Sequence, residues 1–492
     1  MLWYDFGKPE NGQPGDQPKM KTPQILMIAA IAALAGCATA PCCKSKACCK
    51  PCYPDAPKEN FFSLFDGETF LNFEGDVSAF TFERNPVVGT RGRGKNAYTF
   101  CSDANAIVFK PAPDGKPKKI YTKEKYDNFI LRFEYLAETN AWGAVGLRTP
   151  VNACPCKDGV MVALADDFGF EKTDRAADKF SGSITGFQAS RREPNIRLDW
   201  KHESGNTYAK PTGRWNFMEV RALGDTVTTF LNGEKVAEAK IVNRPANGRI
   251  VFVGGDKTMK WMRPRVKRVA ADWRADACPC LNKAPEGFTS LFDGKTLANW
   301  KGVTTEEKFD RPWVRQAATP AKRAEMQKKA DEMMRQFWSV REGALFFDGK
   351  KGGYSLATMK NYGDFELWCD WRLQNVQGDS GLYPRGVCQI QIWDAHNMWH
   401  LGSGGLYNNK ENPRHAMEIA DFNVGDWNRF HVKMVGKRIT VWLNGRLVVE
   451  NTLLENANLK NFPGTEVPDR EQLELQCHGD PLEFRNIFIK EL

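Results

Sequence analysis

The sequence predicts an all-β protein built from two antiparallel β-sandwich domains in tandem. Three observations support this fold class. Landmark motifs occur twice in the same order, strand-like segments alternate with a period of two, and glycine and tryptophan are plentiful, at 42 and 15 of 492 residues. The hydrophobic fraction of 42% is enough for buried cores and excludes a disordered or collagen-like chain.

The N-terminal segment predicts the compartment. An apolar run at 25–34 follows Lys21 and leads into the sequence LAGC at 34–37. A charged start, a short apolar stretch and small residues before the cleavage point are typical of a secretory signal peptide, and this ending resembles a bacterial lipobox. The run is too short to span a bilayer. We therefore expect residues 1–36 to be an upstream extension and lipoprotein signal peptide, and Cys37 to carry a lipid that anchors the protein to a membrane of the bacterial cell envelope, on its periplasmic or extracellular face.

Cysteine usage fits an oxidising compartment. A tether at 37–60, rich in Cys, Lys and Pro, holds six of the 14 cysteines, and the motif Cys-Pro-Cys occurs at 154–156 and again at 278–280. No histidine lies near these clusters in the sequence, so disulfides or incidental use are favoured over a zinc site. Cys369 and Cys388 lie in apolar strand patterns, and we expect them in the core.

Two copies of one domain follow the tether. The sequence SLFDGET at 63–69 recurs as SLFDGKT at 290–296, and FLNG at 230–233 recurs as WLNG at 442–445. Two copies are the simplest explanation for landmarks that keep their order. We expect a first, diverged sandwich at 61–274, a linker at 275–287 and a second sandwich with the active site at 288–492.

Within each copy the local pattern is that of antiparallel strands. Segments 129–135 and 365–371 alternate with a period of two and are rich in aromatic residues. Segment 438–449 predicts a hairpin around Asn444-Gly445, because both residues accept positive φ. Helical sequence is confined to 321–337, which excludes a helical enzyme and a parallel βαβ protein.

Charge excludes one class of partner. The formal charge of +9 is a small excess of 69 basic over 60 acidic side chains. No dense stripe of lysine and arginine accompanies it, and we therefore expect no nucleic-acid partner. Charge and composition leave the oligomeric state open.

The second copy carries a series of short motifs in a fixed order. They are LFDGK at 291–295, WKG at 300–302, GGY at 352–354, YGDFEL at 362–367, DSGLYPRG at 379–386, QIQIWD at 389–394, GLY at 405–407, GDWN at 425–428, WLNG at 442–445, HGDP at 478–481 and FRNI at 484–487. With this set the second copy resembles the 3-keto-disaccharide hydrolase domain family, and the first copy resembles a diverged member. The resemblance implies concanavalin-like (jelly-roll) sandwiches and a carbohydrate substrate.

One strand of the second copy is a candidate sugar-binding surface. Gln389, Gln391 and Trp393 alternate with apolar residues and therefore share one face. Amide groups and an indole ring suit hydrogen bonding to a sugar and stacking on its ring. The alternative is a solvated outer face. Arg385 and Tyr407 are expected as further substrate contacts.

Three residues are candidates for catalysis. Asp394 and His396 could hold a divalent metal ion, or they could act as an orienting acid and a base. The alternative is a polar loop with no ligand. His478 opens a turn that matches the family and is the second candidate base. Gln389 departs from the family, which commonly has an acidic residue there, and an amide cannot replace that charge.

The first copy lacks most of these groups. Its corresponding strand is 161–166, where both glutamines become apolar and the terminal acid remains as Asp166. The His-Gly-Asp turn is replaced near Gly254, so no histidine is offered there. We interpret the first copy as an accessory or sugar-binding domain, with plain structural support as the alternative.

The resemblance implies a carbohydrate-active hydrolase or lyase acting on 3-keto-glycosides or disaccharides. A ketone at C3 acidifies the proton on C2, so a modest base can remove that proton before the C1 substituent leaves. The alternative from another class is a non-catalytic glycan-binding lipoprotein made of two lectin-like sandwiches.

Overall fold

Antiparallel strands build most of the structure, a computed structural model. It describes residues 57, 59–91, 97–111, 113–171, 180–186, 208–241, 245–350, 354–398, 400–455 and 466–492. The expected signal peptide, Cys37 and most of the tether lie outside these residues. Within the described part of the chain, no helix has the length and apolar character needed to cross a bilayer.

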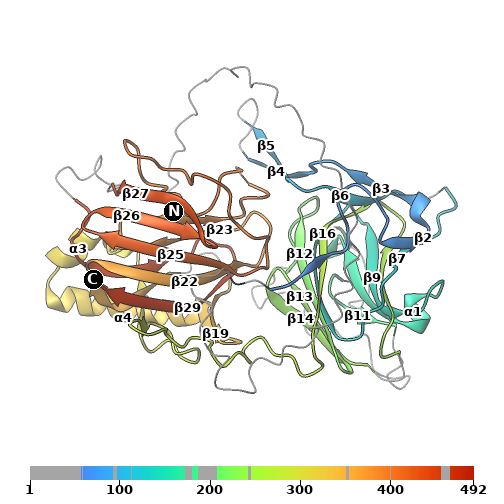
Figure 1. The fold of residues 1–492 in the computed structure, drawn as a ribbon, viewed down its shortest axis with the longest axis horizontal. Coiled ribbons are helices and arrows are strands. Elements are labelled where there is room, and N and C mark those ends of the chain that lie inside the picture. The colour runs from blue at the N-terminus through green and yellow to red at the C-terminus, as the bar shows by residue number, and fades with distance from the viewer. Residues whose placement is uncertain are drawn as a thin grey trace, which may run out of the picture. The chain divides into compact units, whose positions relative to one another are not determined.

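The described residues of the first repeat form two sheets and one separate hairpin (Figure 1). The strands of its eight-stranded sheet are β1 (Phe62–Ser63), β3 (Phe80–Glu83), β6 (Ala106–Phe109), β8 (Phe129–Ala137), β12 (Asn216–Leu223), β13 (Thr226–Leu231), β14 (Glu234–Lys240) and β16 (Met259–Arg268). Those of its six-stranded sheet are β2 (Phe73–Gly75), β7 (Lys118–Thr122), β9 (Trp142–Thr149), β10 (Val160–Ala165), β11 (Ile184–Thr185) and β15 (Arg249–Gly254). The hairpin is β4 (Val87–Arg91) with β5 (Tyr98–Cys101).

The second repeat contains an eight-stranded and a five-stranded sheet. The larger is made of β17 (Thr289–Ser290), β19 (Trp338–Arg341), β20 (Ala344–Phe347), β22 (Phe365–Leu373), β25 (Asn428–Val435), β26 (Arg438–Leu443), β27 (Arg446–Leu453) and β29 (Leu482–Glu491). The smaller is made of β18 (Trp300–Val303), β21 (Ser355–Tyr362), β23 (Asp379–Tyr383), β24 (Ile390–Trp393) and β28 (Glu471–Leu475).

The two repeats share one topology. The larger sheets run β14-β13-β12-β8-β16-β6-β3 and β27-β26-β25-β22-β29-β20-β19, and the first strand of each repeat adds to the same position, β1 on β16 and β17 on β29. The smaller sheets run β11-β10-β9-β15-β7-β2 and β24-β23-β28-β21-β18. Each repeat also has its own core cluster, with side chains from both of its sheets. The predicted fold class of two tandem jelly-roll sandwiches is confirmed.

Helices are few. α4 (Pro320–Phe337) confirms the predicted helical segment. Thr319 caps its N-terminus, because the Thr319 hydroxyl accepts a hydrogen bond from the backbone N of Lys322 at 3.2 Å. Three short helices were not predicted, because one or two turns leave no periodic pattern in a sequence. They are α1 (Pro155–Asp158), α2 (Asp167–Glu171) and α3 (Pro312–Ala317).

The structure agrees with the predicted hairpin turn and with the predicted burial of two cysteines. The β26–β27 hairpin turns at Asn444 and Gly445, with φ of 53° and 81°, as the Asn-Gly pair predicts. Cys369 and Cys388 are buried, as expected. Of the two Cys-Pro-Cys motifs, the first closes a disulfide between Cys154 and Cys156.

Candidate functional site

The five-stranded sheet of the second repeat carries polar side chains on the face turned away from the core. Leu382 of β23, Ile390 of β24 and Leu475 of β28 pack into the core, so the residues that alternate with them point to the other side. These three strands are neighbours in the sheet. We call five of their outward side chains the polar face: Tyr383, Gln389, Gln391, Glu474 and Gln476.

Hydrogen bonds join four members of the polar face. Gln389 Nε2 donates to Oε1 of Gln391 at 3.1 Å and to Oε1 of Gln476 at 2.9 Å. The Tyr383 hydroxyl donates to Gln389 Oε1 at 3.1 Å and accepts from Gln476 Nε2 at 3.1 Å. Gln389 and Gln391 share a face, as the alternation predicts. They are 5% and 3% exposed, so this face is buried rather than solvated.

A glycine makes room for this network. Gly381 pairs with Gln391 across β23 and β24, and a Cβ at its position would lie 2.5 Å from Cγ of Gln389. Its φ is not in the left-handed region, so space rather than backbone conformation requires a glycine here.

Glu474 is the acidic member of the polar face. It pairs in register with Tyr383 and is 5% exposed. Burial is the main cause that raises its pKa, to about 7, and the neighbouring Glu471 adds to the rise while Arg315 opposes it. Gln472 Nε2 donates to its Oε1 at 2.7 Å. A carboxyl group that titrates near neutral pH is suited to proton transfer.

The helical insertion brings Arg315 beside this carboxyl group. The insertion lies between β18 and β19 and contains α3 and α4, whereas the first repeat has a single 3-10 turn between β2 and β3. Arg315 of α3 places Nη2 at 3.6 Å from Glu471 Oε1 and at 3.5 Å from Glu474 Oε1. Its Nη1 donates to the carbonyl oxygen of Phe309 at 2.7 Å. A pocket of about 290 Å³ lies between the insertion and the sheet, and Glu471, Gln472 and Arg315 are among its lining residues.

The first repeat has an apolar surface in place of the polar face. The backbone N of Gly182 donates to Ala163 O at 2.8 Å, and in the second repeat Gly404 N donates to Gln391 O at 2.8 Å, so Ala163 occupies the place of Gln391. The strand registers extend the correspondence across the sheet. Met161, Gly146, Val251 and Val253 stand where the second repeat has Gln389, Tyr383, Glu474 and Gln476.

This apolar surface is also covered. Val251, Val253 and Ala144 form a small apolar cluster with Met161 packed against it. A Cβ at Gly146 would lie 2.6 Å from Cβ of Pro155, the α1 residue between the two disulfide-bonded cysteines. The loss of both glutamines that the sequence predicts for the first copy is therefore part of a wider replacement.

Asp394 supports a loop in the second repeat, and its counterpart Asp166 does so in the first. The buried carboxylate Oδ2 of Asp394 accepts hydrogen bonds from the backbone N of Gln377 at 2.9 Å and from Asn397 Nδ2 at 2.8 Å. Asp166 of the first repeat accepts a bond from the backbone N of Asn140 at 2.9 Å in the same way. Gln377 and Asn140 both have left-handed φ, at 62° and 56°. Because the arrangement recurs where the polar face is absent, it indicates a structural role.

His396 lies at a contact between the repeats. Its Nδ1 is 2.5 Å from Oδ2 of Asp103 in the first repeat, and its Nε2 is 3.0 Å from the carbonyl oxygen of Asp421. Burial lowers the pKa of His396, but the Asp103 carboxylate outweighs it and the net shift is upward. An imidazole that donates from both nitrogens carries a proton on each, so neither nitrogen can accept a proton or bind a metal in this arrangement.

A substitution of His396 should therefore act mainly on stability. His396→Asn removes a charge-assisted contact of the order of 1 kcal/mol, and we expect turnover to fall by less than about tenfold. The pKa of His396 is raised in the folded state, so its stabilisation is complete below the unfolded pKa near 6.5 and is lost as the pH rises through the folded value. Thermal melts at pH 6 and pH 9 test this. A turnover loss of a hundredfold or more with an unchanged melt would make His396 a catalytic base instead.

His478 is the predicted catalytic residue that adjoins the polar face. Its half-exposed ring places Nδ1 at 3.7 Å from Oδ2 of Asp379. Asp379 in turn accepts a hydrogen bond at Oδ1 from Gln391 Nε2 at 2.7 Å. The structure thus separates the predicted trio, with Asp394 and His396 in supporting contacts and His478 at the edge of the site.

The other predicted substrate contacts have structural partners. Arg385 is 1% exposed, and its guanidinium donates to the carbonyl oxygen of Gly363 at 2.7 Å and to Asp364 Oδ1 at 3.0 Å. The Trp393 indole is buried and donates to the carbonyl oxygen of Leu401 at 2.5 Å. The Tyr407 ring lies 5.6 Å from the guanidinium of Arg414.

The predicted metal ligands do not fit a metal ion in this arrangement. Both nitrogens of His396 and one carboxylate oxygen of Asp394 are already in hydrogen bonds. Across the described residues, no group of three or more His, Cys, Asp or Glu side chains is arranged to hold a cation.

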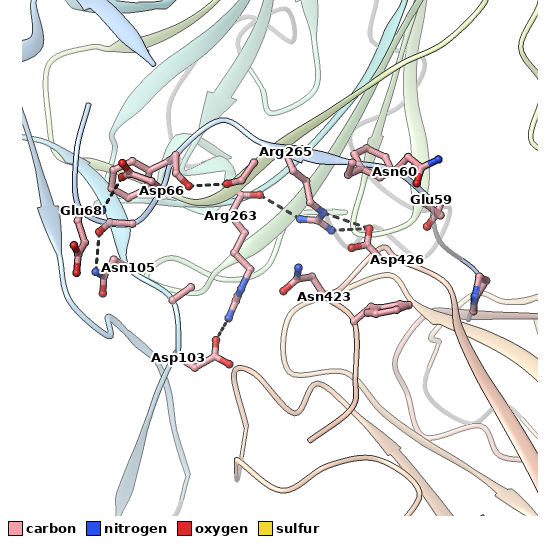
Figure 2. Close-up of a pocket in the computed structure, with 17 residues that line it drawn as sticks. Glu59, Asn60, Asp66, Glu68, Asp103, Asn105, Arg263, Arg265, Asn423 and Asp426 are labelled. Carbon is pink, nitrogen blue, oxygen red and sulfur yellow. Dashed lines mark hydrogen bonds and ion pairs between the residues drawn. The ribbon is translucent and has the colours of Figure 1, made fainter. Parts of the chain in front are cut away.

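A larger cavity, of about 690 Å³, is lined by side chains of both repeats (Figure 2). Both of its lining arginines are paired with acidic side chains. Arg263 Nη2 lies 2.5 Å from Asp103 Oδ1, and Arg265 Nη2 lies 3.1 Å from Asp426 Oδ1. The polar face does not line this cavity, and the two features are distinct.

Sequence reasoning missed Glu474, Tyr383 and Arg315. One signal was present, because the sequence EQLELQ at 471–476 alternates polar and apolar residues as 389–394 does. Arg315 carried no signal, since it belongs to a short helix that reaches the sheet from an insertion.

The chain matches one protein family and is similar to several solved structures. A family model described as the 3-keto-alpha-glucoside-1,2-lyase-like domain matches residues 60–267 and 287–490. No curated protein matches the chain. Among solved structures, the chain is similar to a protein from Parabacteroides distasonis provisionally described as a glycosyl hydrolase, at 20% identity and a TM-score of 0.32, over 43% of this chain and 99% of that one. It is also similar to the carbohydrate-binding module CBM66 from Bacillus subtilis, at 12% identity and a TM-score of 0.23, over 38% and 95% of the two chains.

The family matches cover both repeats and confirm the resemblance that the motifs carry. The chain therefore belongs to the 3-keto-alpha-glucoside-1,2-lyase-like domain family, of which it contains two tandem copies, and its function is carbohydrate-related.

Proposed function

We propose that the second repeat cleaves 3-keto-glycosides by elimination, with Glu474 as the base that takes the C2 proton. The observation that carries this proposal is the buried carboxyl group of Glu474, with a pKa raised to about 7, beside neutral hydrogen-bonding side chains of the polar face. The family description supports the reaction class. The first repeat has Val251 in place of Glu474 and is proposed as an accessory domain.

The chemistry needs a base of moderate strength. The C3 ketone acidifies the proton on C2, and the Glu474 carboxylate takes that proton while the C–H electron pair forms an enolate with the ketone. The enolate then collapses, a double bond forms between C1 and C2, and the bond from C1 to the aglycone oxygen breaks. The aglycone leaves with the electron pair and takes up a proton. Addition of water to the resulting enone would complete a hydrolysis.

The neutral members of the polar face suit recognition of the sugar. Gln389, Gln391 and Gln476 offer amide donors and acceptors, and Tyr383 keeps its proton because burial, followed by the nearby Glu474, raises the pKa of its hydroxyl. The hydroxyl groups of a bound sugar can replace hydrogen bonds that these side chains now make with one another. His478 and Asp379 lie at the edge of the face, and we propose that they contact a bound glycoside.

Turnover of a keto-sugar by the intact chain tests the proposal. A 3-keto-glucoside with a chromogenic aglycone should release the aglycone, with a transient enone that absorbs in the near ultraviolet. The unoxidised glucoside should remain intact, because its C2 proton is not acidic. Equal release from both substrates would indicate an ordinary glycosidase and would overturn the elimination.

The second candidate function is glycan binding without catalysis. Gln389 favours it, because the side chain is neutral where the family commonly has an acid, and its amide is already satisfied by Gln391 and Gln476. Glycan binding by the wild-type chain with no release from the 3-keto-glucoside would support this alternative.

We also propose that the protein is lipid-anchored at the cell envelope through Cys37. The sequence LAGC at 34–37 supports this. Cys37→Ala should leave an unprocessed or soluble protein, because no lipid can be attached. Detergent phase partitioning measures the effect, and unchanged partitioning of the variant into the detergent phase would contradict the anchor.

A further inference from the structure

Lys301 lies on the same sheet face as Glu474. Lys301 of β18 pairs with Ala357 of β21, Ala357 pairs with Glu474 of β28, and Glu474 pairs with Tyr383 of β23. Residues paired in register across antiparallel strands point to one face. Backbones two strands apart are separated by roughly 10 Å. Ala357 between them carries only a methyl group, and Arg315, whose Nη2 lies 3.5 Å from Oε1 of Glu474, lines the same pocket as Lys301.

The amine of Lys301 is available to a ligand. The side chain is half-buried and lines the pocket of about 290 Å³ between the sheet and the insertion. Within the ranges that the structure describes, its Nζ has no hydrogen bond or ion pair. Burial, and then the positive charge of Arg315, lower its pKa, while carboxylates act in the opposite direction. The carboxylates that face it are Glu471 and Glu474 of β28 and Asp331 of α4.

The first repeat again provides the comparison. The registers place Glu74 where the second repeat has Lys301, and Tyr121 where it has Ala357. Glu74 is paired with Arg249 at 2.7 Å, and Tyr121 belongs to the apolar cluster. The unpaired amine of Lys301 and the small residue beside it therefore occur together in the repeat that also carries Glu474.

We propose that this pocket binds the ketone-bearing ring of the substrate and that Lys301 donates a hydrogen bond to its C3 oxygen. The inference rests on the proposed function and names the group that would stabilise the enolate. As Glu474 takes the C2 proton, the C–H pair forms the C2–C3 double bond and the carbonyl π pair moves onto the oxygen. The ammonium of Lys301 faces that developing charge. No bond forms to the lysine, and its proton remains with it or is shared with the oxygen.

Variants of Lys301 in the intact chain test this role. Lys301→Met should lower kcat for the 3-keto-glucoside by about 10² to 10³, the loss typical of a single oxyanion donor. Lys301→Arg keeps a cationic donor and should restore part of the rate, and it should move the alkaline limb of the pH profile upward because arginine stays protonated. Lys295→Met, at an exposed turn before the same strand, is the matched control.

Binding separates this inference from the proposed function. In calorimetry, 3-keto-glucose should bind wild type and Glu474→Gln more tightly than glucose does, and Lys301→Met should lose that preference. Turnover with no effect of Lys301→Met would overturn the role of Lys301 and leave the elimination standing. Lys301-dependent keto-sugar binding without turnover would support the pocket and remove the proposed reaction.

A covalent role is the remaining outcome to distinguish. A lysine with a lowered pKa can also attack a ketone and lose water to form an imine. Borohydride added during turnover would reduce such an imine to a stable amine, which peptide mass spectrometry would detect on Lys301. We expect no adduct, and an adduct on Lys301 would replace the hydrogen-bond role with a covalent one.

Discussion

Glu474→Gln should lower kcat for a 3-keto-glucoside by about 10² to 10⁴ while the chain remains folded. The amide keeps the shape of the side chain and its bond with Gln472, but it cannot take a proton. Binding of the keto-sugar should change little. Steady-state kinetics on the chromogenic substrate measure the loss, and a variant that retains wild-type kcat would show that the base lies elsewhere.

Glu474→Gln should also change the thermal stability, and the direction of the change depends on the pH. The pKa of Glu474 is raised to about 7 in the fold from its ordinary value of 4.5, so the folded state disfavours its charge. Stability is therefore lost as the pH rises from the unfolded value toward 7. Glu474→Gln should melt above wild type at pH 8, and the difference should shrink toward pH 5. A lower melt at pH 8 would mean that the carboxylate is well accommodated.

Gly381→Val should disrupt the polar face. A Cβ at this position already meets Gln389 Cγ at 2.5 Å, so the larger side chain must displace Gln389 and its bonds to Gln391 and Gln476. Overpacking of this kind costs about 1–3 kcal/mol. We expect turnover to fall by at least about tenfold, since misplaced binding groups raise the barrier.

The first repeat offers the matched control for that variant. Ala144 occupies the position equivalent to Gly381 and is fully buried. Ala144→Val should lower the melt by a similar amount and leave turnover close to wild type. If both variants lose turnover equally, the loss reflects stability alone and the polar face carries no special role.

Much of the architecture could be predicted because local patterns dictate it. Period-two alternation marks β8 and β22, the Asn444-Gly445 pair fixes a hairpin turn, and α4 starts with a proline that follows a capping threonine. These features depend on neighbours in the sequence. The shared face of Gln389 and Gln391 follows from the same alternation and is seen in the structure.

The site was less accessible to sequence reasoning, because its members meet through strand order. Asp394 and His396 are close in the sequence, yet Asp394 bonds to Gln377 while His396 contacts Asp103 in the other repeat. Their closeness in the sequence suggested that the two side chains act together, but in the fold each contacts a different partner. Glu474 lies far along the chain from Gln389 and reaches the same face because β28 and β24 both adjoin β23.

The two repeats differ in the residues that they carry on one equivalent sheet face. The same topology carries Glu474, Tyr383 and Lys301 in the second repeat, and Val251, Gly146 and Glu74 in the first. The first repeat has Val251 at the place of Glu474, and its Glu74 is paired with Arg249, so we expect no counterpart of the proposed reaction there. Its apolar face is stabilised instead by packing beneath α1.

The pH dependence of kcat/KM is the most direct measurement of the role of Glu474. A base must be deprotonated to act, so kcat/KM should rise with pH along an acid limb near pH 7, set by the raised pKa of this residue. The limb should remain in His478→Asn, which removes the histidine at the edge of the site, and should be absent from the residual activity of Glu474→Gln. An acid limb that disappears in His478→Asn and persists in Glu474→Gln would assign the base to the histidine and contradict the mechanism proposed here.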